Sequence, residues 1–120
     1  MARALRDSTV CLVLLGVALS LGLPHALATD WNQRNEQYSS KIQPILTKYC
    51  LGCHSGAQAE SGLALNNFAD AKSVFRERRI WEKVAQRLDI ADMPPADSPQ
   101  PAEAVRKRGS EWINCTLNDI

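Results

Sequence analysis

Apolar residues recur with helical spacing in several segments of the chain. In the first, they follow the i, i+3, i+4, i+7 pattern of one helix face at Ile42, Ile45, Leu46 and Tyr49. Ser39 or Ser40 is the expected cap of this helix. Pro44 is expected in its first turn, where backbone N–H groups lack partners.

Three further helices are expected along the chain. A short one begins after Asp70, which can cap it, and ends near Phe75. The next has its apolar positions on one face and must end before the prolines of Asp92-Met93-Pro94-Pro95; these positions are Ile80, Trp81, Val84 and Leu88. The last helix begins near Pro99 or Pro101, and its apolar stripe consists of Ala102, Val105, Gly109, Trp112, Ile113 and Thr116.

Gly109 lies in the middle of the last stripe, where glycine is unfavourable in a helix relative to alanine. A close crossing with another helix would explain it, and a tolerated surface glycine is the alternative. Leu63 and Leu65 alternate like a short extended piece against an apolar surface. Because no segment has the pattern of a regular strand, the sequence predicts an all-α domain.

The N-terminus has the pattern of a secretory signal peptide. Arg3 and Arg6 precede an apolar run over residues 10–23, and Ala26-Leu27-Ala28 follows. The run is shorter than the roughly 20 residues that span a bilayer. We therefore expect residues 1–28 to be removed and residues 29–120 to form one domain, with no membrane span after cleavage.

Charge and cysteine content exclude several classes of protein. The chain has 14 Lys and Arg against 13 Asp and Glu, a balance that argues against nucleic-acid binding. Without the signal peptide three cysteines remain, so at most one disulfide can form and the chain is not a disulfide scaffold. A domain of this size has a small core and often needs a further stabilising group.

The sequence CLGCH at residues 50–54 carries the most specific chemistry. A zinc site would need a second pair of ligands, but after cleavage Cys115 stands alone and His54 is the one histidine. A redox dithiol is expected at the start of a helix beside a parallel sheet, whereas this motif follows a helix. Cys-x-x-Cys-His is the attachment signature of a c-type haem. It predicts thioether bonds from Cys50 and Cys53 and a proximal iron ligand in His54.

Met93 is the candidate for the sixth iron ligand. Apart from Met1 it is the only methionine, and no second histidine remains for the other haem face. The prolines after it keep the segment stiff and non-helical, which suits presentation of a thioether from a loop; a methionine filling a gap in the core is the alternative. His and Met together raise the haem potential and leave no open position on the iron, which favours electron transfer over catalysis.

These motifs resemble the planctomycete-type cytochrome c domain, a relative of class I cytochromes c. The resemblance covers residues 42–118 and rests on Tyr49-Cys50-x-x-Cys53-His54, Gly62-Leu63-x-Leu65, Trp81-Glu82-Lys83-Val84, Asp92-Met93-Pro94-Pro95 and Trp112-Ile113. It implies a class I fold of about four helices around one covalently bound haem c. It also implies that Leu63, Leu65 and Trp81 line the haem pocket. The family often has a second glycine where this chain has Ser61.

The expected function is electron transfer in the bacterial periplasm, without enzymatic activity, in exchange with a redox partner protein that the sequence does not name. A haem-based sensor, in which Met93 leaves the iron and a small gas enters, is one alternative. An accessory redox domain of a large secreted enzyme is another, since such domains commonly open longer proteins. The chain would then be a free-standing or truncated version.

Overall fold

The structure is a computed structural model that describes residues 30–118; the predicted signal peptide falls outside these residues. Within them every regular element is helical, which confirms the all-α prediction. The elements are α2 (Trp31–Gln37), a π-helical turn (Tyr38–Ile42), α3 (Gln43–Tyr49), two 3₁₀ turns (Glu60–Gly62 and Leu65–Asn67), α4 (Ala71–Arg76), α5 (Arg78–Asp89) and α6 (Glu103–Asn118). No helix in this range is long and apolar enough to cross a membrane.

The first helical segment begins earlier than the apolar pattern predicts. Asp30 caps α2 by accepting hydrogen bonds from the N–H groups of Asn32 and Gln33, at 3.0 and 3.2 Å. The prediction of a cap at Ser39 or Ser40 was wrong, because the helical backbone continues from α2 through the π-helical turn into α3. The α2 sequence is almost entirely polar and none of its residues is buried, so periodicity could not reveal it.

The π-helical turn precedes Pro44, which lies inside this long helical segment. Proline has no N–H and removes one i to i−4 hydrogen bond from a helix. Just before it, the N–H of Gln43 donates to the carbonyl of Tyr38, the wider i to i−5 spacing. The predicted apolar face is buried at Ile42, Ile45 and Leu46, and Tyr49 is half-buried.

Asp70 caps α4, as the sequence predicts. Its carboxylate accepts a hydrogen bond of 2.7 Å from the N–H of Ser73, and the Ser73 hydroxyl lies 3.2 Å from the Asp70 N–H. The backbone hydrogen bond is the main reason that the pKa of Asp70 is lowered. The following helix, α5, buries Trp81, Ala85 and Leu88.

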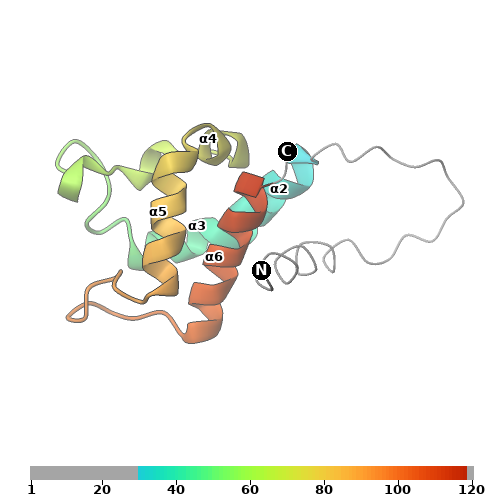
Figure 1. The fold of residues 1–120 in the computed structure, drawn as a ribbon. Helices are drawn as coiled ribbons and strands as arrows, with labels where there is room; N and C mark the ends of the chain where they lie inside the picture. The colour runs from blue at the N-terminus through green and yellow to red at the C-terminus, as the bar shows by residue number, and fades with distance from the viewer. Residues whose placement is uncertain (1–29, 119–120) are drawn as a thin grey trace, which may run out of the picture.

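The close helix crossing predicted at Gly109 is present. A Cβ atom there would lie 3.3 Å from Leu88 Cδ1 of α5 and 3.9 Å from Ile45 Cδ1 of α3. The α5 and α6 helices pack against each other at an angle (Figure 1). The predicted α6 stripe is correct from Gly109 onward, but Ala102 is exposed and precedes the helix, while Ser110 and Leu117 are also buried.

Aromatic side chains fill the core between these helices. Tyr38 packs on Trp112 with ring centroids 5.5 Å apart, and Trp81 meets the ring of Phe68 nearly edge to face at 5.2 Å. The Tyr38 hydroxyl donates to the carbonyl of Phe68 at 2.6 Å. This bond ties the first helical segment to the loop before α4. The two long irregular segments, 50–70 and 90–102, extend from the side of the bundle opposite α2 (Figure 1).

Candidate haem site

The Cys-x-x-Cys-His motif forms a compact turn at the C-terminal end of α3. At the helix end, the N–H groups of Cys50 and Leu51 both donate to the Leu46 carbonyl, each at 2.9 Å. The N–H groups of Cys53 and His54 then both donate to the Cys50 carbonyl, at 3.2 and 3.0 Å. The turn therefore brings the three predicted haem-binding residues of the motif together on one short stretch of backbone.

The two thiols of the motif are free and differ in environment. Cys50 is half-buried and packs against the core, and Cys53 is exposed. Burial raises the pKa of the Cys50 thiol to about 11. Two unpaired thiols three residues apart are what two thioether bonds to one porphyrin edge require.

His54 is oriented by a backbone carbonyl. Its Nδ1 atom lies 3.2 Å from the carbonyl oxygen of Glu60. Because a carbonyl oxygen can only accept, Nδ1 must carry the proton, which leaves Nε2 with its lone pair in the neutral ring. This arrangement is typical of a metal-binding histidine, whose second nitrogen donates to a carbonyl and so fixes the tautomer.

The loop after the motif folds back onto it. The N–H of Glu60 donates to the Cys53 carbonyl at 2.9 Å, and the N–H of Leu65 donates to the His54 carbonyl at 2.8 Å. Within the loop Ser61 has φ 56°, a left-handed conformation that favours glycine. The loop turns at the position where the family often has glycine, even though serine stands there.

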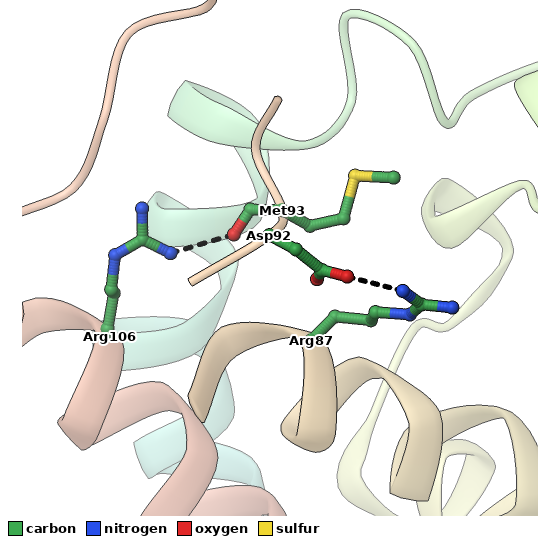
Figure 2. Close-up of polar contacts among 4 residues, drawn as sticks. All are labelled: Arg87, Asp92, Met93 and Arg106. Carbon is green, nitrogen blue, oxygen red and sulfur yellow. Dashed lines mark hydrogen bonds and ion pairs between the residues drawn. The ribbon is translucent and has the colours of Figure 1, made fainter. Parts of the chain in front are cut away.

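Met93 lies four residues after Asp89, the last residue of α5, and Figure 2 shows its polar surroundings. The N–H of Asp92 donates to the Arg87 carbonyl at 3.3 Å, and the side chains of the two residues form an ion pair. The guanidinium of Arg106 on α6 donates to the Met93 carbonyl at 2.8 Å. The Met93 side chain is 41% exposed, and its sulfur points away from Arg106 (Figure 2).

Met93 and the motif lie on separate segments. None of the described hydrogen bonds or ion pairs links Met93 to Cys50, Cys53 or His54. Both segments belong to the irregular part of the domain on the side of the bundle opposite α2 (Figure 1). The structure thus assembles the motif itself and leaves the methionine thioether without a polar partner among the described residues.

The three residues expected to line the haem pocket belong to the core or pack on it. Trp81 is fully buried, Leu65 is 3% exposed, and Leu63 is half-buried against the same cluster. The indole N–H of Trp81 is buried with no acceptor in the described part of the chain. Leu63 and Ala64 have an extended backbone between the two 3₁₀ turns, and Leu65 begins the second turn. The predicted short extended piece is therefore present and packs against the core.

Three groups that contribute to the site were not predicted from the sequence. They are the carbonyl of Glu60 and the side chains of Gln100 and Arg106. The Glu60 contact could not be predicted, because every residue has a backbone carbonyl and the residue type does not show which one will accept. The cluster of prolines around Met93 was a usable signal for the other two, because prolines supply no N–H and leave nearby carbonyls in need of side-chain donors.

The donor set fits a c-type haem better than a metal ion held by protein side chains alone. Between residues 30 and 118, no three His, Cys, Asp or Glu side chains form a group that could hold a metal ion. The free thiols of Cys50 and Cys53, with the adjacent His54 held through Nδ1, are instead the groups that a haem c needs.

An all-helical domain with a Cys-x-x-Cys-His turn at the end of a helix defines the class of c-type cytochromes. Within that class, the model of the planctomycete cytochrome C family matches residues 50–97, from the first cysteine of the motif to the loop after Met93. Residues 50–97 thus match a planctomycete cytochrome c domain, which confirms the resemblance over that range. No curated protein and no solved structure matches it.

This match has four general implications. A cytochrome c domain implies a covalently bound haem c and a role as a haem-based electron carrier. Such domains are typically not enzymes, and they typically function outside the cytoplasm.

Proposed function

We propose that this domain carries single electrons in the periplasm, with one haem c held by Cys50 and Cys53 and ligated by His54 and Met93. The haem supplies the one-electron redox centre when it is bound. The observation that carries the proposal is the turn at residues 50–54, in which both thiols are free and His54 Nδ1 faces the Glu60 carbonyl.

Each residue of the proposed site has a distinct part. Cys50 and Cys53 would hold the haem by thioether bonds, so that it cannot dissociate in a dilute compartment. His54 would offer Nε2 as the proximal ligand, held in place by the Nδ1 contact. Met93 would offer its soft thioether to the opposite face.

Closure of both faces supports electron transfer over substrate chemistry. With His54 and Met93 both in place, no position is left for a substrate or a gas. The domain would then exchange electrons with a redox partner protein through the part of the haem edge that remains exposed. Export to the periplasm rests on the predicted signal peptide at residues 1–28.

The covalent part of the proposal is tested by removing the thiols. In a host that attaches c-type haem, we expect the Cys50→Ala/Cys53→Ala double variant to lose all haem that survives denaturing electrophoresis. Cys115→Ala is the matched control, since Cys115 lies on α6 outside the motif, and it should keep covalent haem. Haem that stays attached to the double variant would refute the thioether assignment.

A further inference from the structure

The segment between α5 and α6 is poor in backbone donors. Four of the eight residues from 94 to 101 are proline, and none of these four has an N–H. Carbonyl oxygens in this segment therefore have few backbone donors; that of Pro95 accepts one backbone hydrogen bond, from the N–H of Ser98 at 2.9 Å. Other hydrogen bonds to them must come from side chains or water. In the structure two side chains provide these bonds, Gln100 within the segment and Arg106 in the first turns of α6.

The side-chain amide of Gln100 contacts several carbonyl oxygens of this segment. Its Nε2 atom lies within hydrogen-bond distance of three carbonyl oxygens, at 3.1 Å from Pro94, 2.7 Å from Pro95 and 3.0 Å from Ser98. Its Oε1 atom accepts a hydrogen bond from the guanidinium of Arg106. One exposed side chain thus fixes the curvature of the loop and connects it to α6.

Arg106 completes the connection to Met93. One nitrogen of its guanidinium, Nη2, donates to Gln100, and the other, Nη1, donates to the Met93 carbonyl at 2.8 Å (Figure 2). The planar guanidinium holds its donors in a fixed fork, so a lysine could not reproduce both bonds with the same geometry. On the other side, the Arg87–Asp92 ion pair joins the residue before Met93 to α5.

We propose that Gln100 and Arg106 are positioning residues that keep the Met93 thioether directed at the haem iron. This inference rests on the proposed function, because it takes Met93 as the distal ligand. A thioether is a weak ligand, and its occupancy of the iron depends on how tightly the backbone holds it. Loss of the Arg106 bonds would let the loop leave its position and expose the iron to external ligands.

The test measures the apparent affinity of the oxidised holoprotein for imidazole, which competes with Met93 for the iron. We expect Arg106→Ala to raise this affinity about tenfold, the factor that corresponds to about 1.4 kcal/mol. The band that arises from iron–methionine coordination should weaken in parallel. Arg108→Ala is the matched control, because Arg108 is exposed and lies two residues further along α6. It should leave the imidazole affinity and the iron–methionine band unchanged.

Two further variants keep the test decisive. Gln100→Ala should raise the imidazole affinity in the same direction, so the inference remains testable if Arg106→Ala does not fold. Arg106→Lys should give an intermediate value, since an ammonium can replace one of the two bonds. Failure of both Gln100→Ala and Arg106→Ala to raise the affinity would overturn the proposal.

A double-mutant cycle separates positioning of Met93 from a general structural effect. In the Met93→Ala background, replacing Arg106 by alanine should leave the imidazole affinity unchanged, because the competing thioether is already gone. If Arg106→Ala raised the imidazole affinity equally in the wild-type and Met93→Ala backgrounds, the positioning role would be overturned. The assignment of Met93 as the ligand would stand. A wild-type affinity equal to that of Met93→Ala would instead show that Met93 does not occupy the iron, and would overturn the ligand assignment together with the inference.

Discussion

Two side chains of the domain are each fixed by a contact with one backbone carbonyl. His54 Nδ1 meets the carbonyl of Glu60, and the Tyr38 hydroxyl donates to that of Phe68. The first contact leaves Nε2 as the ring nitrogen available for the proposed iron bond. The second connects the helix before the motif to the loop that leads into α4, so it stabilises the frame around the site.

The Tyr38 bond predicts a stability effect that depends on pH. Burial raises the pKa of Tyr38 to about 12, and the nearby Asp70 carboxylate adds to the shift. The folded state thus favours the neutral phenol, whose stabilising contribution is complete below about pH 10 and declines as the pH rises toward 12. Tyr38→Phe should lower the free energy of unfolding by about 1 kcal/mol near neutral pH.

Urea unfolding of the holoprotein at a series of pH values would measure this effect. The stability difference between wild type and Tyr38→Phe should narrow as the pH rises above about 10. Tyr49→Phe is the control, since the Tyr49 hydroxyl makes no hydrogen bond within the described residues, and it should change stability little. A difference that stays constant with pH would contradict the raised pKa.

At the scale of single residues, the sequence indicated candidate chemistry but few of the contacts around it. The roles proposed for Cys50, Cys53 and His54 rest on a spacing that matches a specific attachment motif. Asp70 could be assigned because an acidic residue before a helix is a common cap. The partners of Met93 could not, because the contacts of Gln100 and Arg106 depend on how the proline-rich loop curves in three dimensions.

Among the secondary-structure elements, the C-terminal end of α5 has the most direct link to the site. The N–H of Asp92 donates to the Arg87 carbonyl and that of Ala91 donates to the Leu88 carbonyl. This is the Schellman pattern of helix termination, with Ala91 in the position that usually holds glycine. Ala91 accordingly has φ 58°. The Arg87–Asp92 ion pair spans the same motif and leads the chain directly to Met93.

This geometry predicts that Ala91→Gly stabilises the domain. Glycine adopts a positive φ without the steric cost that alanine has, so the substitution should stabilise the folded state. The greater conformational freedom of glycine in the unfolded chain offsets part of this stabilisation. We expect an increase of about 0.5–1 kcal/mol in the free energy of unfolding, measured with urea. Ala96→Gly, at an exposed loop residue without a positive φ, should be neutral or destabilising. Equal effects of the two variants would contradict this account.

Helices with an apolar face were predictable, and polar ones were not. Spacing of apolar residues predicted the buried faces of α3, α5 and α6. The side chain of Asp70 predicted the cap of α4. The α2 helix has no buried residue, so its sequence holds no periodic signal and its helical state depends on the cap at Asp30 and on continuity with α3. For the same reason the first helix was expected to start near Ser40, several residues too late.

At the scale of the whole molecule, one glycine defines how three helices meet. Gly109 lets α6 approach Leu88 of α5 and Ile45 of α3. Its position in mid-helix made a crossing predictable, but its partners were not, because a missing side chain says nothing about which helix fills the space. The expectation of a class I arrangement came from the resemblance to a family, not from the pattern of apolar residues.

The domain leaves its proposed haem-binding groups on the irregular side of the helix bundle. The cluster of buried side chains is small, as expected for a chain of this length, and a covalently held haem would extend it. The central claim is therefore that one haem c is attached to the motif and closed on its second face by Met93.

One measurement tests this claim most directly. It is the visible spectrum of the reduced protein, secreted by a host that attaches c-type haem, taken with and without carbon monoxide after acid-solvent extraction of loose haem. The account predicts a low-spin c-type spectrum that survives extraction and does not change with carbon monoxide. Loss of the spectrum on extraction would contradict the thioether bonds, and a shift with carbon monoxide would contradict closure of the iron by Met93 and favour a ligand-binding sensor.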